Sequence, residues 1–237
     1  MEVNNGQIVI IPDIHGDVFW KSALEALPDT LFIFLGDYLD PYNDEDISSQ
    51  DAYYNLIEIL DLKQRHPDNV ILLWGNHDLH YIYRYLMGSR YDYTNSEKYF
   101  QFFWLNQEYF QIAYDTIING KTYLFTHAGV GRKWAERINN QYSTMAPTAA
   151  ELNKLFQSRS FIEALAARSS IRGGWSDYGS LIWADCREQL DEDNQYKDII
   201  QIFGHTRRKE PLNIENRIFC LDCNRCFILS RGNGHIE

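Results

Sequence analysis

The feature that most constrains this chain is a series of short aliphatic runs, each followed at once by polar residues and glycine or proline. Between the first three runs lie two longer segments whose apolar residues recur at helical spacing. The runs predict strands at 7–11, 31–35 and 70–74, and the longer segments predict helices at 18–27 and 51–65. This alternation is typical of βαβ units, so the sequence predicts an α/β fold.

Further along the chain, similar patterns predict more elements of both kinds. In the second predicted helix, the apolar stripe that faces the core consists of Leu56, Ile59, Leu60 and Leu62. Further strands are expected at 123–125, 198–203, 217–221 and 226–230, and helices within 95–112 and 149–167. We expect the last two strands to be joined as a hairpin by a tight turn at Asn224 and Arg225.

Length and charge limit the classes of protein that fit. With 237 residues, of which 45% are hydrophobic, the chain is long enough for one domain with a sizeable core and short for two. We therefore expect a single domain over residues 1–237. The formal net charge is −11, and a surface of that sign repels a nucleic-acid backbone, so long DNA or RNA is not an expected partner.

The lack of a recognisable targeting signal and the context of the cysteines predict an ordinary cytoplasmic protein. Residues 1–7 have no basic region followed by a long apolar stretch, and no window reaches the roughly 18 apolar residues of a membrane span. We expect a cytoplasmic location and no membrane partner. Cys220, Cys223 and Cys226 have a spacing seen in metal or cluster sites. They fall in a predicted strand and its turn, so reduced thiols are the favoured interpretation.

Five of the predicted strands end in a potential metal ligand. These ligands are Asp13 and His15, Asp37, Asn76, His127 and His205. Because the loops at the carboxyl ends of strands converge in α/β sheets, the side chains are expected to share one site. A single histidine or aspartate beside glycine is normally a turn residue. The joint placement favours a pair of divalent metals that accept both oxygen and nitrogen ligands, such as manganese, iron or zinc.

In this order, the blocks resemble the signature of the calcineurin-like metallophosphoesterases. The blocks are Asp13-x-His15-Gly16, Gly36-Asp37-x-x-Asp40, Gly75-Asn76-His77-Asp78, His127-Ala128-Gly129 and Gly204-His205. The second block and residues 181–185 resemble, more narrowly, the branch with the serine/threonine phosphoprotein phosphatases and the symmetrical diadenosine tetraphosphate hydrolases. The resemblance extends to about Asp222. It implies a β-sandwich flanked by α-helices, with the metal site at the carboxyl ends of strands.

The resemblance also implies a role for each of the six ligands. Asp13 and His15 hold the first of two divalent metals, Asp37 bridges both, and Asn76, His127 and His205 complete the second. Manganese is the expected metal, with iron and zinc as alternatives.

The residue that follows the Asn76 ligand is expected to move a proton. His77 faces the same cleft through its neighbour and is not needed as a ligand, so we assign it as the general acid for the departing oxygen. The resemblance places Asp40 beside it as the carboxylate that orients it.

One position departs from the family pattern. Phosphoprotein phosphatases usually continue the second block as Asp-Arg-Gly, with the arginine gripping the substrate phosphate, whereas this chain has Pro41 after Asp40. Arg132, Arg172 and Arg207 follow or precede other blocks and are candidate replacements, with Arg172 favoured.

Three functions are compatible with these residues. The leading hypothesis is a phosphomonoesterase that acts on phosphoserine or phosphothreonine in proteins, or on small phosphate esters. One alternative is a pyrophosphohydrolase of dinucleoside polyphosphates. Another is a phosphatase-like scaffold without activity, which the complete ligand set disfavours.

Overall fold

Two mixed five-stranded sheets form the centre of the molecule in the computed structural model, which describes residues 6–26 and 30–237. In the first sheet the strand order is β10-β1-β2-β3-β4. Its strands are β1 (Gln7–Ile11), β2 (Leu31–Phe34), β3 (Val70–Leu73), β4 (Phe110–Gln111) and β10 (Phe227–Ser230). The first four run parallel to their neighbours, and β10 pairs antiparallel with β1. The expected parallel βαβ units therefore lie at the start of the chain.

The second sheet has the strand order β5-β6-β7-β9-β8. Its strands are β5 (Ala113–Ile118), β6 (Lys121–Thr126), β7 (Ile199–Phe203), β8 (Leu212–Ile214) and β9 (Ile218–Cys220). The central strands β6, β7 and β9 are parallel, while β5 and β8 close the two edges in the antiparallel direction.

The side-chain alternation along β1 explains why two sheets stack. Ile8 and Ile10 are buried in an apolar cluster that also holds Phe125 of the second sheet. Val9 and Ile11 point the other way and are buried in the cluster that contains the helices. Both faces of the strand are apolar, so the sheet needs a second sheet on one side and helices on the other.

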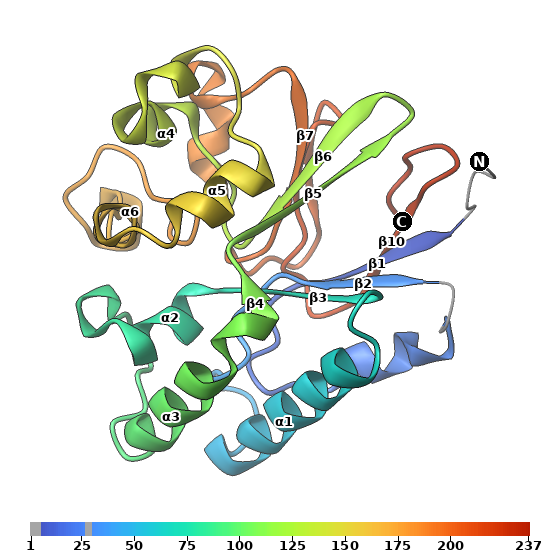
Figure 1. Ribbon diagram of the computed structural model, residues 1–237, viewed down its shortest axis with the longest axis vertical. Helices are drawn as coiled ribbons and strands as arrows, with labels where there is room; N and C mark the ends of the chain where they lie inside the picture. The colour runs from blue at the N-terminus through green and yellow to red at the C-terminus, as the bar shows by residue number, and fades with distance from the viewer. Residues whose placement is uncertain (1–5, 27–29) are drawn as a thin grey trace.

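Helices cover both sheets. Beneath the first sheet in Figure 1 lie α1, α2 and α3, whereas α4, α5 and α6 gather beside the second sheet. Their bounds are α1 (Ser49–Arg65), α2 (Asn76–Ile82), α3 (Ser96–Asn106), α4 (Arg132–Ile138), α5 (Ala149–Leu155) and α6 (Arg159–Ala164). Short 3₁₀ helices are η1 (Phe19–Ala26), η2 (Arg84–Leu86), η3 (Gln107–Tyr109), η4 (Asn140–Ser143), η5 (Ser170–Arg172), η6 (Cys186–Leu190) and η7 (Glu192–Asn194). The predicted layered β-sandwich with flanking helices is confirmed.

Helix α1 illustrates how the sequence specifies these elements. The hydroxyl of Ser48 accepts a hydrogen bond from the backbone N–H of Asp51 and so caps the amino end. The four leucine and isoleucine residues of the predicted stripe are all buried against the first sheet and its neighbours. The helix expected over 18–27 is the 3₁₀ helix η1, and Leu27 lies outside the described residues.

The predicted hairpin near the carboxyl terminus is wrong. Strand β9 has β7 on one side and β8 on the other, so neither of its edges is open for β10. The chain instead crosses to the first sheet, where β10 pairs with the free edge of β1 and places Ser230 opposite Gln7. Open strand edges gain hydrogen bonds from such pairing, which explains the switch of sheet.

Cys186, Cys220, Cys223 and Cys226 are all free thiols. Within the described ranges, no helix combines the length and the apolar character needed to cross a bilayer.

Candidate metal centre

All six predicted ligands meet at the carboxyl ends of five strands that belong to both sheets. Asp13 and His15 follow β1, Asp37 follows β2, Asn76 opens α2 after β3, His127 follows β6, and His205 follows β7. Each of the six residues is buried, with at most 7% of its surface exposed. The two sheets therefore contribute ligands to one buried cluster.

Asp37 stands between two groups of these ligand atoms. Its Oδ2 atom is 3.6 Å from Nε2 of His15 and 3.5 Å from Nε2 of His127. On the first side, Asp13 Oδ2 is 4.0 Å from His15 Nε2. On the other, Asn76 Oδ1 is 2.9 Å and His205 Nδ1 is 3.1 Å from His127 Nε2. One carboxylate oxygen thus faces both groups, which is the arrangement that the sequence resemblance implies for a bridging ligand.

Hydrogen bonds to the backbone fix the tautomers of two histidines. Nδ1–H of His15 donates to the carbonyl oxygen of Leu39, and Nδ1–H of His127 donates to that of Leu35, both at 2.8 Å. Each Nε2 lone pair is therefore free to bind a metal. Burial lowers the pKa of His15 well below its usual value and that of His127 to about 3, so both rings are neutral in the metal-free protein.

In each of the two aspartates, one carboxylate oxygen accepts a backbone hydrogen bond. Oδ1 of Asp13 accepts the backbone N–H of His205 at 2.8 Å, and Oδ1 of Asp37 accepts the backbone N–H of His77 at 2.8 Å. Among the described residues, Oδ2 of Asp13 is buried without a hydrogen-bond partner. Burial raises the pKa of both carboxyls, and the negative charges of neighbouring aspartates raise it further. Divalent cations would relieve both costs, so the residues fit the metals that the sequence resemblance implies.

The backbone around these ligands is held in an unusual conformation. His15, Asp37, Asp40 and His205 have φ angles of 43°, 54°, 60° and 64°, respectively. Left-handed backbone is uncommon for residues other than glycine and tends to gather at functional sites. The strain supports a common function for these loops.

Asp78 connects the loops after β2 and β3. Its carboxylate accepts hydrogen bonds from the backbone N–H groups of Gly75, Asp37 and Tyr38 at 2.8, 2.9 and 3.0 Å. The residue belongs to the quoted sequence block, but the sequence analysis gave it no role. Its contacts identify it as the side chain that holds the bridging ligand in register with α2.

His77 and Asp40 lie together beside the ligand cluster, as expected. Nδ1 of His77 is 2.7 Å from Asp40 Oδ2. Asp40 also pairs with Nε2 of His80 at 2.8 Å and accepts a hydrogen bond from the hydroxyl of Tyr81. Burial alone would raise the pKa of Asp40, but the bonds from His77 and His80 lower it to about 2. The carboxylate is therefore ionised and held by three donors.

His80 and Tyr81 were not foreseen, although the sequence carried a signal. They follow His77 by three and four residues in α2, and such positions lie on the same face of a helix.

The three arginines named from the sequence lie in different surroundings. Arg132 donates to the carbonyl oxygens of Asp193 and Ser143, and none of its hydrogen bonds reaches a predicted ligand. Arg172 lies next to His205: it donates to Thr206 Oγ1 at 2.6 Å and pairs with Asp185 at 3.0 Å.

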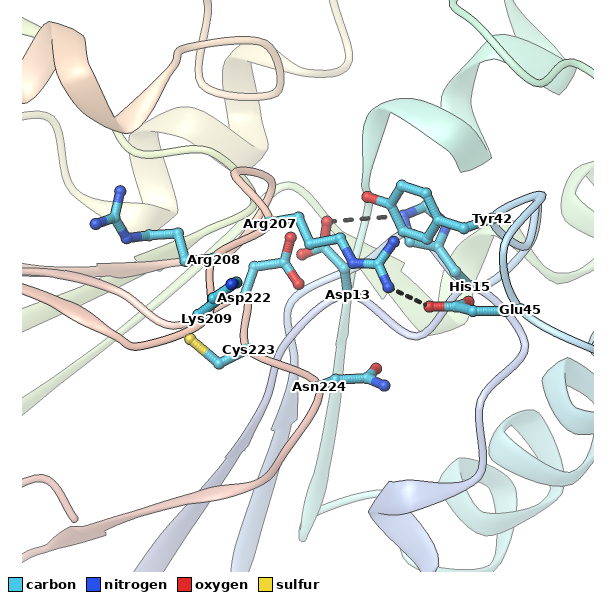
Figure 2. A pocket seen from close by; sticks show the side chains of 10 residues that line it. All are labelled: Asp13, His15, Tyr42, Glu45, Arg207, Arg208, Lys209, Asp222, Cys223 and Asn224. Atoms are coloured by element: carbon cyan, nitrogen blue, oxygen red, sulfur yellow. Dashed lines mark hydrogen bonds and ion pairs between the residues drawn. The ribbon is translucent and has the colours of Figure 1, made fainter.

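Arg207 lies at the entrance to the cluster. Its guanidinium pairs with Asp44 and Glu45 at 3.3 and 2.8 Å. It lines a cavity of about 520 Å³ whose walls include Asp13 and His15. Figure 2 shows Arg207 reaching toward Glu45 beside Tyr42, whereas Arg208 points away from them.

A fourth arginine, Arg90, reaches the cluster from a loop outside all the sequence blocks. Its Nη2 atom is 3.3 Å from Nε2 of His15 and 3.2 Å from Nε2 of His77. No motif or spacing in the sequence marks this residue, since it lies 13 positions after His77 in a loop.

Comparison with known proteins places this site in a family. The model of the calcineurin-like phosphoesterases matches residues 6–209. A cold-active protein-tyrosine phosphatase of a psychrophilic Shewanella species has a TM-score of 0.57 and 16% identity, over 98% of this chain and 81% of that chain. A protein serine/threonine phosphatase from Saccharomyces cerevisiae has a TM-score of 0.54 and 16% identity, over 96% and 74%. At such identities the two structures establish the fold alone. Since the family model spans most of its length, this chain belongs to the calcineurin-like phosphoesterase family and is a hydrolase.

Proposed function

We propose that this chain hydrolyses phosphate monoesters, either phosphoserine and phosphothreonine in proteins or small phosphate esters. The observation that carries the proposal is the position of Asp37 Oδ2 between two groups of ligand atoms, with the His77–Asp40 pair next to them. Two divalent ions held there would supply a water of lowered pKa and would neutralise charge on the phosphoryl oxygens.

The chain's own residues divide the work of metal binding. Asp13 and His15 would hold one ion, Asn76, His127 and His205 the other, and Asp37 both. The backbone N–H and C=O groups that fix the other end of each ligand keep the metal-binding atoms in place before a metal arrives. The ligand set therefore needs little rearrangement on binding.

His77 would donate the proton that the departing oxygen needs. Its Nδ1 is held by the ionised Asp40, so Nε2 is the atom that faces the cluster and can carry the transferred proton. Burial lowers the pKa of His77 to about 4, while the hydrogen bond and negative charge of Asp40 act in the opposite direction and the bond fixes the plane of the ring. His80 and Tyr81 in turn hold Asp40.

The monoester reaction is preferred because two proteins that share the fold are protein phosphatases, one for tyrosine and one for serine/threonine. Manganese is the metal we propose. The cytoplasm, where the four free thiols would stay reduced, is the proposed compartment.

A substrate panel tests the proposal. Protein supplied with Mn²⁺ is assayed on phosphoserine, phosphothreonine and phosphotyrosine peptides, on p-nitrophenyl phosphate and on diadenosine tetraphosphate. We expect turnover of the monoesters, its loss in Asp37→Asn, and wild-type rates in Asp46→Asn, which removes an exposed carboxylate of the neighbouring loop. Turnover confined to the dinucleotide would replace the proposal by the pyrophosphohydrolase.

Metal analysis separates an enzyme from a scaffold. Protein purified without chelator and dialysed against Mn²⁺ should retain metal, and Asp37→Asn should not. Failure of the wild-type protein both to retain metal and to hydrolyse p-nitrophenyl phosphate would favour the scaffold.

A further inference from the structure

Arg90 occupies the space between the first ligand group and the proposed general acid. Its Nη2 atom lies within hydrogen-bond distance of Nε2 of both His15 and His77. Both histidines donate through Nδ1, so their Nε2 atoms are lone-pair acceptors that point at the same guanidinium. The positive group thus lies beside the place that a substrate phosphate would take to meet both the metal and the acid.

A stack on Tyr42 holds this guanidinium. The Cζ atom of Arg90 is 3.6 Å from the centroid of the Tyr42 ring, and that of Arg207 is 4.1 Å from the same centroid. Two guanidiniums this near one centroid cannot share a face of the ring, so Tyr42 lies between them. Tyr42 also meets the edge of His15, with centroids 4.8 Å apart. The residue that follows Pro41 therefore positions arginines from elsewhere in the chain.

The loop that carries Arg90 is fixed on both sides. The backbone N–H of Asp92 donates to the hydroxyl of Tyr81 at 3.1 Å, and Tyr91 stacks on Tyr81 with ring centroids 4.9 Å apart. Before the arginine, the N–H of Gly88 approaches Nδ1 of His80 at 3.5 Å. His80 and Tyr81 are the residues that hold Asp40, so one set of contacts orients both Arg90 and the acid pair.

The charge and the unused donors of Arg90 indicate what it binds. Its Nη1 atom is buried and has no hydrogen-bond partner within the described part of the chain. A buried charged donor is costly unless an acceptor meets it. If His15 gave its lone pair to a metal, the guanidinium would lose an acceptor and would lie beside a second positive charge. A dianionic group with several oxygens, such as a phosphate monoester, satisfies both needs.

We propose that Arg90, held by Tyr42, binds the phosphoryl group that is hydrolysed and so supplies the grip that is absent at Pro41. This inference rests on the proposed function. The backbone of Arg90 is left-handed, with φ of 59°. This conformation is unfavourable for arginine, and such backbone tends to occur at functional sites, which agrees with a functional role for the side chain.

Binding of inorganic phosphate to the Mn²⁺-loaded protein tests the inference without any turnover. Calorimetry on Arg90→Ala should show a Kd about 10- to 100-fold weaker than that of the wild type, the usual loss for a charge-assisted bond. Arg90→Lys should lie between, since an ammonium cannot offer the planar fork. The matched control is Arg84→Ala, which removes an exposed arginine of the same region and should bind phosphate as the wild type does.

Two further measurements exclude a merely structural role. Metal content should stay at the wild-type level in Arg90→Ala, and added guanidinium ion should restore part of its phosphate affinity. Unchanged phosphate binding with full metal content, or no restoration by guanidinium, would overturn the inference. If Arg90→Ala does not retain metal, Arg90→Lys decides: weaker phosphate binding supports the inference, and wild-type binding contradicts it.

The outcome is separable from that of the proposed function. A wild-type protein that binds phosphate through Arg90 but hydrolyses no ester would contradict the proposed function alone. An active enzyme whose phosphate affinity does not depend on Arg90 would contradict this inference alone.

Discussion

At the scale of single residues, the cluster contains buried side chains that lower the stability of the folded protein when no metal is bound. Asp37 is buried, and burial followed by the nearby charge of Asp78 raises its pKa. An aspartate with a raised pKa stabilises the fold only at low pH, and that contribution is lost as the pH rises through the raised value. The metal-free protein therefore carries a penalty at this position that grows with pH.

Asp37→Asn should consequently stabilise the metal-free protein while abolishing metal binding. In chelator at pH 8, we expect the variant to melt a few degrees above the wild type, and the difference to shrink as the pH falls toward 5. Asparagine tolerates the left-handed φ of 54°, so the backbone should not oppose the change. Calorimetry with and without Mn²⁺ measures both effects, and a lower melting temperature in chelator would contradict the argument.

His77→Asn should separate metal binding from proton transfer. The variant should keep its metals, because His77 contributes only its backbone N–H to Asp37. Turnover of an alkyl phosphate should fall by about 10²- to 10⁴-fold, and that of p-nitrophenyl phosphate much less, since its leaving group needs no proton. His235→Asn, an exposed histidine, serves as the control. An unchanged rate on the alkyl phosphate would remove His77 as the acid.

The sequence predicted which residues would form the cluster, but it did not predict all the contacts that position them. Asp13 and His205 were expected together because both follow strands, and the structure joins them by a hydrogen bond. Arg90 could not be foreseen, because its place depends on how a loop packs against Tyr42 and Tyr81, which no local pattern encodes. Long-range packing of this kind becomes visible only in three dimensions.

At the scale of elements, two glycines make room for the carboxylates that we propose as metal ligands. A Cβ at Gly75, the residue before α2, would clash with Oδ1 and the backbone N of Asp37, and a Cβ at Gly204, after β7, would clash with Oδ1 of Asp13. Neither glycine has a positive φ, so space rather than backbone freedom explains their presence. At both strand ends, a glycine thus leaves the space that a proposed ligand from a neighbouring strand fills.

Gly75→Ala and Gly204→Ala should each displace a carboxylate and weaken metal binding about 10- to 100-fold, the usual effect of disturbing residues that orient metal ligands. The folded state should persist in Gly204→Ala, whose added Cβ is crowded only by the carboxylate of Asp13, whereas Gly75→Ala also crowds the backbone N of Asp37 and should lower the melting temperature. Metal titration and circular dichroism check the two statements. Gly232→Ala is the matched control, because its added Cβ would meet only Ser230 at an ordinary 3.6 Å. Wild-type metal affinity in both variants would contradict the proposed arrangement.

Strands were easier to foresee from the sequence than their partners. The aliphatic run at β1 matches the predicted bounds, because a strand buried on both faces is apolar throughout. The pairing of β10 with β1 was missed, because the short connection after β9 has the length of a hairpin and only the occupied edges of β9 forbid one. Strand β5 was also missed, since its partly exposed face weakens the apolar pattern.

At the scale of the whole molecule, the ligand cluster joins the two sheets. Asp13, Asp37 and Asn76 come from the first sheet, and His127 and His205 from the second. The hydrogen bonds from His205 to Asp13 and from His127 to Leu35 already cross between them. Metal bound by both sets would add a second connection across the sandwich.

Metal binding should therefore stabilise the entire fold rather than one loop. A ligand at about 100 times its Kd adds about 2.7 kcal/mol, which for a chain of this size corresponds to a rise in melting temperature of about 5–10 °C. Calorimetry in Mn²⁺ against chelator measures the shift, and Asp37→Asn should not show it. Hydrogen exchange should slow in β1 and β7 together, because a metal held by the proposed ligands would link strands of different sheets. Protection confined to one sheet would mean that the metal does not bridge them.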